Sequence, residues 1–403
     1  MKKKVLFVIL DGAGDGLRPG TTLERAFKPV LDSFTKNGFA GLIENKLLDH
    51  PDSGVSIFNL FGYKKDDYPG RGYLDAMGIG LPQLKDTVYM RGNYATVEEI
   101  VAEKAENQYE TRLRLVDRRA GRDINGLREI TRDIKEINIE GIKVKLFKSV
   151  AHRCVLMMSN IDISPNVSDS NCQVGEIIPK IKPLDNDTAS IRTASVLNKW
   201  SNEVYKIMKN HSANKYRKIP ANYILLRGAS MWKIEKSFEE KFSLKGAVIA
   251  ASPVVRGIGR HLEMGVIDVS GATGDKNTNL KNKVLAALDA LHSYNYVVLH
   301  ILSPDIYAHD KDINGKIANI EKIDREVFAR IKEYVDFSKT ILVVTSDHVT
   351  NPESGRHEPG MFPFMIYTLG INPNNIEKYA EEACKLGPVI QIENFMEQLI
   401  GYL

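Results

Sequence analysis

The strongest constraint on the fold is a set of short apolar runs without the polar alternation of a half-exposed strand. They are Val5–Leu10, Ala247–Ala250, Tyr296–Ile301 and Thr340–Thr345. Strands of a parallel sheet are buried on both faces, so they read as continuous apolar runs. Helical periodicity follows in three places: Asn279–His292, Lys316–Val335 and Ile376–Lys385. This alternation predicts an α/β fold with a mostly parallel sheet covered by helices.

The middle of the chain has a different character. From about Tyr89 to Asn222 the apolar runs are shorter and more polar, and Ser159–Asp187 is rich in Ser, Asn, Asp and Pro, which is typical of loops. We therefore expect a discontinuous core domain of residues 1–88 and 223–403. A smaller α+β domain of residues 89–222 is inserted into it.

Composition excludes several classes of protein. A net charge of +4 over 403 residues, with acidic and basic residues interspersed, argues against a nucleic-acid partner. The sequence contains no apolar run of about 18 residues, so we expect no membrane span. Its three cysteines, Cys154, Cys172 and Cys384, lack metal-site spacing and indicate free thiols in a reducing cytoplasm. A small-molecule partner fits best, and the oligomeric state is not indicated.

Acidic and imidazole side chains follow two of the predicted strands. Asp11 ends the first run, while Asp305 and His309 follow the third and, four apart, share one face of a helical turn. Ligands of open α/β sheets bind at the carboxyl ends of strands. Each signal has an ordinary alternative, because Asp before Gly12 is common in turns and Asp305 could cap a helix.

A third cluster follows the strand Thr340–Thr345. It contains Asp347 and His348, with His357 one loop away. An adjacent Asp-His pair is also common on solvated surfaces. Taken together, however, three aspartates and three histidines at strand ends fit two divalent cations, and this ligand chemistry suits manganese or zinc better than magnesium.

Ser53 is the candidate nucleophile. It lies in a turn before an apolar segment, where a serine more often caps a helix. A serine hydroxyl is a weak nucleophile at neutral pH unless a base or a metal ion activates it. The residues alone leave both roles open.

The ordered set of Asp11, Ser53, Asp305, His309, Asp347, His348 and His357 resembles the archaeal-type cofactor-independent (2,3-bisphosphoglycerate-independent) phosphoglycerate mutases of the alkaline phosphatase superfamily. The resemblance spans nearly the whole chain. Other segments that carry it are Gly70–Gly80, Arg91–Thr96, Asp117–Arg122, His152–Arg153, Leu226–Ala229 and Gly271–Gly274. It implies an alkaline-phosphatase-like sheet with an inserted substrate domain.

The resemblance also implies roles for these residues. One divalent ion would be held by Asp11, Ser53, Asp347 and His348, and a second by Asp305, His309 and His357. Ser53 would carry a phosphoserine while 2- and 3-phosphoglycerate are interconverted in glycolysis and gluconeogenesis. The ions are expected to be manganese, with zinc, cobalt or magnesium as further possibilities, and no 2,3-bisphosphoglycerate is needed.

Phosphoglycerate carries a carboxylate and a phosphate, and arginine binds both groups through paired hydrogen bonds. The candidate substrate-binding residues are Arg91, Asp117, Arg119, Arg122, Arg153, Arg192, Arg227 and Arg256. Each of these arginines alone is typical of a protein surface. The cluster around Arg119 is the exception, because like charges so close in sequence repel unless an anion offsets them.

The sequence departs from this family next to the nucleophile. The family has Asp directly after the serine and His four residues after it, where this chain has Gly54 and Ile57. A later Asp-x-Asp-Pro-His segment is matched only by Val167–Cys172. Two alternatives therefore stay open: a metal-dependent phosphatase or other phosphotransferase acting on a small phosphate ester, and a non-catalytic phosphometabolite-binding protein.

Overall fold

The computed structural model describes residues 3–47, 49–105 and 108–403. The chain divides into two compact units. The core unit comprises Met1–Tyr68 and Glu235–Leu403, and the inserted unit comprises Pro69–Ile234. The insertion expected from the sequence, residues 89–222, lies wholly within the inserted unit, which starts earlier and ends later along the chain.

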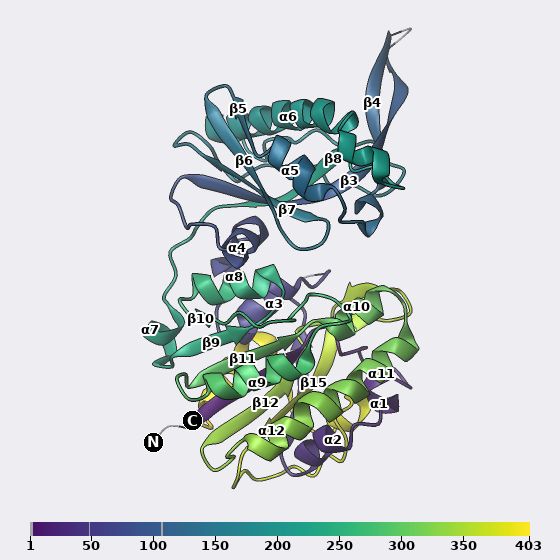
Figure 1. The fold of residues 1–403 in the computed structure, drawn as a ribbon. Coiled ribbons are helices and arrows are strands. Elements are labelled where there is room, and N and C mark those ends of the chain that lie inside the picture. The colour runs from purple at the N-terminus through teal and green to yellow at the C-terminus, as the bar shows by residue number, and fades with distance from the viewer. Residues whose placement is uncertain (1–2, 48, 106–107) are drawn as a thin grey trace. The chain divides into compact units, whose positions relative to one another are not determined.

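The core unit is built on one eight-stranded mixed sheet with the strand order β10-β9-β11-β1-β12-β15-β2-β16 (Figure 1). The strands are β1 (Lys4–Leu10), β2 (Phe39–Asn45), β9 (Gly246–Ile249), β10 (Gly265–Val266), β11 (Tyr296–Ile301), β12 (Thr340–Thr345), β15 (Gly360–Tyr367) and β16 (Val389–Gln391). The five strands from β10 to β12 are parallel, and β15 runs antiparallel to both of its neighbours. The predicted α/β fold and the four predicted strands are confirmed.

Helices cover both faces of this sheet (Figure 1). They are α1 (Thr22–Arg25), α2 (Pro29–Lys36), α3 (Ser53–Leu60), α7 (Phe238–Phe242), α8 (Pro253–His261), α9 (Leu280–Ala290), α10 (Ser303–His309), α11 (Ile313–Ile323), α12 (Ala329–Tyr334), α13 (Glu381–Cys384) and α14 (Phe395–Ile400). A small hairpin of β13 (Val349–Asn351) and β14 (Arg356–Glu358) follows β12.

The alternation of side chains along β1 separates two parts of the core. Val8 belongs to a cluster with Val284 of α9 and Ile323 of α11. Phe7 points to the opposite face, where its ring lies 6.0 Å from those of Tyr296 and Phe395. Because both faces are packed, β1 carries no polar side chain between Lys4 and Asp11, and this burial produces the continuous apolar run seen in the sequence.

One predicted helix is wrong in its first half. Within Ile376–Lys385 only α13 is helical. Asn375 adopts the left-handed conformation at φ 59°, and the Tyr379 amide donates to Asp32 instead of to a preceding carbonyl. The helical spacing of apolar residues here comes from a loop that packs irregularly on the core. The predicted helix Lys316–Val335 forms as α11 and α12, joined by a π-helical turn.

The inserted unit is an antiparallel sheet with the order β4-β3-β7-β6-β5, and β8 pairs with β3. Its strands are β3 (Thr87–Ala105), β4 (Gln108–Asp117), β5 (Glu136–Ile139), β6 (Ile142–Lys148), β7 (Arg153–Ser159) and β8 (Tyr223–Ser230), and its helices are α4 (Arg71–Gly78), α5 (Leu127–Asp133) and α6 (Thr188–Lys209). Residues 160–187 form no helix or strand, as the composition predicts.

The two faces of this second sheet are covered differently. Trp200 of α6 and Ile130 of α5 share a core cluster with Val88 of β3. On the other face, α4 lies so close to β3 that a Cβ at Gly72 would collide with the Tyr89 carbonyl. None of the helices in the described part of the chain combines the length and the hydropathy of a membrane span.

Glu381 gives the core unit a pH-dependent stability. Its buried carboxylate accepts hydrogen bonds from the Asp15 amide at 2.8 Å and the Thr21 hydroxyl at 2.7 Å. Burial and the nearby Asp15 charge raise the pKa of Glu381 to about 7. The folded state therefore binds this proton more tightly than the unfolded chain does. The resulting stability is fully present below about pH 4.5 and is lost as the pH rises through 7.

We predict that Glu381→Gln removes this pH dependence. We subtract the free energy of unfolding of the wild type from that of the variant. This difference should be larger at pH 8 than at pH 5, by up to about 3 kcal/mol, because only the wild type loses stability as Glu381 ionises. Urea denaturation at both pH values measures it. Glu382→Gln, on the exposed side of the same helix, is the control and should follow the wild type. Parallel pH profiles for Glu381→Gln and wild type would contradict the assignment.

Candidate metal centre

The carboxyl ends of three adjacent parallel strands bring the acidic residues together. Asp11 follows β1, Asp347 follows β12, and Asp305 lies in α10 directly after β11. Since β1 lies between β11 and β12 in register, the three strands end at one edge of the sheet. The sequence-based expectation that these side chains converge is therefore met by the topology.

Asp11, Asp347 and His348 form a first group, whose candidate ligand atoms lie within 4.8 Å of one another. The Nε2 atom of His348 is 3.5 Å from Asp11 Oδ1 and 3.2 Å from Asp347 Oδ2. The Ser53 hydroxyl oxygen lies 3.0 Å from the same nitrogen. All three members of the group are buried. Asp347 Oδ2 accepts no hydrogen bond from the described residues and faces this group.

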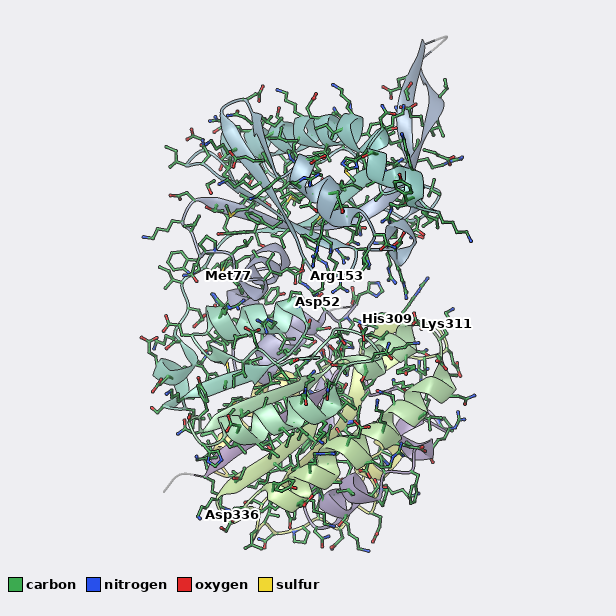
Figure 2. The ribbon with its side chains drawn as sticks, viewed as in Figure 1. Asp52, Met77, Arg153, His309, Lys311 and Asp336 are labelled. Carbon is green, nitrogen blue, oxygen red and sulfur yellow. The ribbon has the colours of Figure 1, made fainter. Side chains whose placement is uncertain are left out.

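Asp305, His348 and His357 form a second group, so His348 belongs to both. His357 Nε2 lies 3.3 Å from Asp305 Oδ1 and 3.1 Å from His309 Nε2. His309, at the end of α10 (Figure 2), places its Nε2 3.3 Å from Asp305 Oδ2. The rings of His348 and His357 stack at 3.8 Å and those of His357 and His309 at 4.9 Å, so three imidazoles face the aspartates in a row.

The hydrogen bonds of the histidines fit a metal. His309 Nδ1 lies 2.8 Å from the Gly355 carbonyl oxygen, and His357 Nδ1 lies 2.7 Å from that of Pro51. A carbonyl can only accept, so both Nδ1 atoms donate, and in the neutral rings both Nε2 atoms present lone pairs. Two lone pairs 3.1 Å apart repel unless a cation lies between them. Histidines oriented in this way by carbonyl oxygens are characteristic of metal ligands.

The local electrostatics also favour positive charge. Burial and the Asp305 charge raise the pKa of Asp347 to about 7. Burial and the neighbouring His357 lower the pKa of His348 to about 3. Although burial opposes it, the hydrogen bond to Asp305 raises the pKa of His357 to about 9. A place that stabilises a proton so strongly on a half-buried imidazole also stabilises a divalent ion, and the residues present fit such an ion.

Ser53 is the first residue of α3 and does not cap it. The N-cap is Asp52, whose carboxylate accepts the Gly54 amide at 2.8 Å. The alternative of Ser53 as N-cap is therefore wrong. Its hydroxyl is directed instead to the shared histidine, which places a candidate nucleophile between a helix N-terminus and the metal groups.

The departure at Gly54 has a steric reason. A Cβ atom at this position would collide with the Tyr68 hydroxyl and would lie 2.9 Å from a methyl group of Val254. Tyr68 therefore fills the space beside Ser53 that a larger residue at position 54 would occupy. Ile57, one turn along α3, is completely buried in the apolar core.

The inserted unit gathers a second charged group around Asp75 of α4. Arg71 lies 3.3 Å from its carboxylate and Arg91 of β3 lies 3.5 Å from it. Burial and repulsion by Arg71 and Arg153 hold the pKa of Arg91 well below its usual value. Burial and the same repulsion lower the pKa of Arg153 to about 10, and Arg227 contributes to both. Asp75 thus pairs with two guanidinium groups of a cluster in which four guanidinium groups repel one another.

A strained loop adds two more arginines. Ala120, Gly121 and Arg122 all adopt left-handed conformations, with φ of 45°, 68° and 59°. Such strain in residues other than glycine concentrates at functional sites. Arg119 and Arg122 act electrostatically on His152, whose pKa burial and the surrounding arginines lower to about 3. The histidine stays neutral among them.

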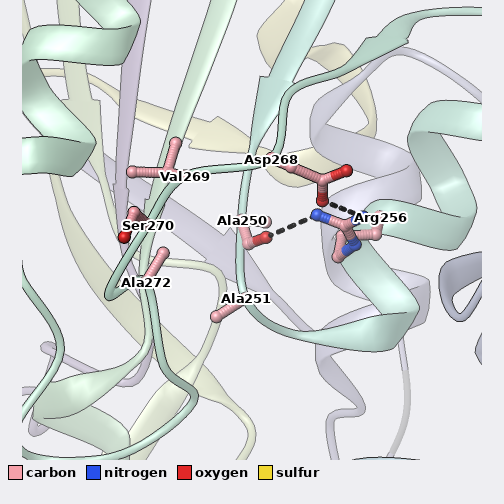
Figure 3. Close-up of a pocket in the computed structure, with 7 residues that line it drawn as sticks. All are labelled: Ala250, Ala251, Arg256, Asp268, Val269, Ser270 and Ala272. Atoms are coloured by element: carbon pink, nitrogen blue, oxygen red, sulfur yellow. Dashed lines mark hydrogen bonds and ion pairs between the residues drawn. The ribbon is translucent and has the colours of Figure 1, made fainter.

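The remaining predicted substrate residues lie apart from this cluster. Asp117 accepts the Arg119 amide at 2.6 Å, which is a local turn contact. Arg192 pairs with Asp162 at 3.0 Å, with both side chains exposed to solvent. In the core unit, Arg256 lines a cavity of about 400 Å³ next to the end of β9, where it binds Asp268 at 2.6 Å (Figure 3).

Sequence reasoning missed four residues that the structure adds to these groups: Arg71, Asp75, His300 and Thr350. The spacing of Arg71 and Asp75, four apart, was a usable signal for an ion pair on one helix face. His300 is a buried residue of β11 that lies 2.9 Å from Asp11 Oδ2. A polar residue inside an otherwise apolar run was the signal there.

Comparison with known proteins relates the whole chain to one group of enzymes. The Metalloenzyme superfamily matches residues 3–398. The 2,3-bisphosphoglycerate-independent phosphoglycerate mutase of Methanopyrus kandleri is 33% identical, over 96% of this chain and 93% of that protein. Among solved structures, a protein of Pyrococcus horikoshii has a TM-score of 0.81 at 25% identity, covering 100% of this chain and 98% of its own.

A second solved structure carries a functional description. The cofactor-independent phosphoglycerate mutase of Thermoplasma acidophilum matches with a TM-score of 0.67 and 29% identity, and 99% of each chain is covered. The likeness extends over both units and is not confined to the metal-binding edge of the sheet.

We predict that the acidic groups destabilise the protein when no cation is bound. A chelator should lower the thermal midpoint by about 5–10 °C, because a ligand at 100 times its dissociation constant contributes about 2.7 kcal/mol. Added manganese should restore the midpoint. In Asp347→Asn the chelator effect should shrink, since one buried negative charge is gone. Equal midpoints with and without chelator, in protein shown to have lost its metal, would refute this.

Proposed function

Because the chain belongs to the archaeal-type family of 2,3-bisphosphoglycerate-independent phosphoglycerate mutases, within the Metalloenzyme superfamily, we propose that it interconverts 2- and 3-phosphoglycerate. The reaction is an isomerisation that serves glycolysis and gluconeogenesis and needs no 2,3-bisphosphoglycerate. The observation that carries the proposal is the complete set of carboxylate and imidazole ligands around the Ser53 hydroxyl. Free thiols at all three cysteines support the cytoplasm as its location.

Two divalent ions would be held by the residues of the two groups. Asp11, Ser53, Asp347 and His348 would bind one, and Asp305, His309 and His357 the other. Mixed carboxylate and imidazole ligands make manganese the proposed metal, with zinc or cobalt as substitutes. Bound ions would lower the pKa of the Ser53 hydroxyl and offset charge on the transferring phosphoryl group.

Ser53 would accept and return the phosphoryl group. Its Oγ forms a bond to phosphorus while the bond from phosphorus to the substrate oxygen breaks, which gives phosphoserine and glycerate. Glycerate stays bound, turns, and takes the phosphoryl group back on its other hydroxyl, so no group is gained or lost. The N-terminus of α3, where Ser53 is the first residue, favours an anion in this position.

The arginine cluster of the inserted unit would bind the anionic groups of phosphoglycerate. Arg91, Arg153 and Arg227 are its members from the sequence-based set, and Arg119 and Arg122 belong to the adjacent loop. Repulsion lowers the pKa values of Arg91 and Arg153, and a bound carboxylate or phosphate would offset this repulsion. Arg192 is already paired with Asp162 and is not assigned to the substrate.

We predict metal-dependent isomerisation without 2,3-bisphosphoglycerate. Metal-stripped protein should be inactive in a coupled assay from 3- to 2-phosphoglycerate and should regain activity with manganese. Ser53→Ala should lower kcat by at least about 10³-fold, because it removes the only group that carries the phosphoryl between the two hydroxyls. Metal analysis of the variant serves as the control for an intact centre. Release of free phosphate without isomerisation would instead identify a phosphatase on the same scaffold.

We also predict a trade between stability and binding at Arg153. Arg153→Gln should raise KM about tenfold or more, because a charge-assisted hydrogen bond to the substrate is lost. The thermal midpoint of the substrate-free variant should stay equal or rise, since one repelling charge is removed. Arg192→Gln is the matched control and should change neither value. An unchanged KM in Arg153→Gln would remove this residue from the substrate site.

A further inference from the structure

Thr350 lies between the two candidate metal groups and contacts one member of each. Its hydroxyl oxygen is 2.9 Å from Asp305 Oδ1 and 3.0 Å from His348 Nδ1. The residue is completely buried in the middle of β13, where it pairs in register with His357 of β14. A threonine in this position has few other possible partners, so its hydrogen bonds can be assigned.

The assignment follows from the chemistry of the three groups. A hydroxyl has one proton to donate, and an ionised carboxylate can only accept, so Thr350 donates to Asp305. His348 Nδ1 must then carry the proton of its ring and donate to the Thr350 oxygen. The other ring nitrogen, Nε2, is left with a lone pair. That nitrogen faces Asp11, Asp347 and the Ser53 hydroxyl.

We propose that Thr350 is a positioning residue that fixes the tautomer and the ring orientation of His348 and thereby couples the two metal groups. The Nδ1–H tautomer is the one in which Nε2 can bind a metal. The same hydroxyl also binds the Asp305 carboxylate. The orientation of this carboxylate therefore depends on the orientation of the His348 ring, which belongs to both groups. This inference rests on the metal-binding part of the proposed function and is independent of the substrate.

The surrounding backbone holds the hydroxyl in place. The Thr350 amide donates to the Gly14 carbonyl at 2.9 Å, which ties β13 to the loop after β1. Gly12 in that loop lies against the same hydroxyl, and a Cβ there would be 2.6 Å from both Thr350 Oγ1 and Asp305 Oδ1. Since Gly12 also has φ of 60°, any other residue would be strained and would displace the bridge.

The test compares two substitutions of Thr350. Thr350→Val keeps the branched shape and removes the hydroxyl, while Thr350→Ser keeps the hydroxyl. Calorimetric titration of metal-stripped protein with manganese measures the affinity for each ion. The ¹⁵N chemical shifts of the His348 ring report its tautomer without any metal. Thr345→Val is the control, because that buried hydroxyl on β12 donates to the Pro363 carbonyl and contacts no candidate ligand.

Wild type and Thr350→Ser should show the Nδ1–H tautomer and bind two ions. Thr350→Val should show a mixture of tautomers and bind both ions about 10–100-fold more weakly, the effect usual for partners of metal ligands. The control should follow the wild type. Wild-type affinity and tautomer in Thr350→Val would overturn the proposal, as would an equal loss in Thr345→Val.

The proposal stays testable if Thr350→Val does not fold. The wild-type protein alone must then show His348 with its proton on Nδ1 in the absence of metal, and a proton on Nε2 would refute the assignment. Failure of the proposed mutase reaction is a separate result. It would appear as intact binding of two ions and a normal tautomer without isomerisation.

Discussion

Mutual repulsion of carboxylates is the constraint on which the core unit depends. Asp11, Asp305 and Asp347 end or follow neighbouring parallel strands and are buried together, where an unpaired charge costs several kcal/mol. Backbone carbonyls bind the Nδ1–H groups of His309 and His357, and the Thr350 hydroxyl lies against Nδ1 of His348. The negative charge of the three carboxylates at this edge of the sheet would therefore be offset by a bound cation and not by a rearranged hydrogen bond.

The inserted unit has the opposite imbalance. Arg71, Arg91, Arg153 and Arg227 repel one another near Asp75, Arg227 also interacts with Asp169, and His152 nearby stays neutral. Each unit thus gathers several like charges in a buried place. Proteins retain such unfavourable arrangements where ligands complete them. Under the proposed function a divalent cation would complete the first arrangement, and a phosphorylated carboxylic acid would complete the second.

The sequence revealed those features that follow from local burial and chain order. Strands such as β11 were visible because both of their faces are covered, and the metal ligands were visible because they follow strand ends. Thr350 was not visible, since its role depends on a hairpin that returns its hydroxyl to Asp305. The failed helix at Ile376 shows the same limit, because apolar spacing there reflects tertiary packing. The capping role that the pattern indicated for Ser53 is taken by its neighbour Asp52.

The register of β1 has a consequence for how this protein is made. Its two partners, β11 and β12, are the fifth and sixth of the eight core-sheet strands in chain order, and both follow the whole inserted unit. At 5–20 residues per second, β1 leaves the ribosome roughly 15–60 s before β11 exists. For that time the apolar run Val5–Leu10 lacks both of the strands that it pairs with in the sheet. The central strand of the core sheet is thus made first and paired late, so the core unit can be completed only after the inserted unit has been synthesised.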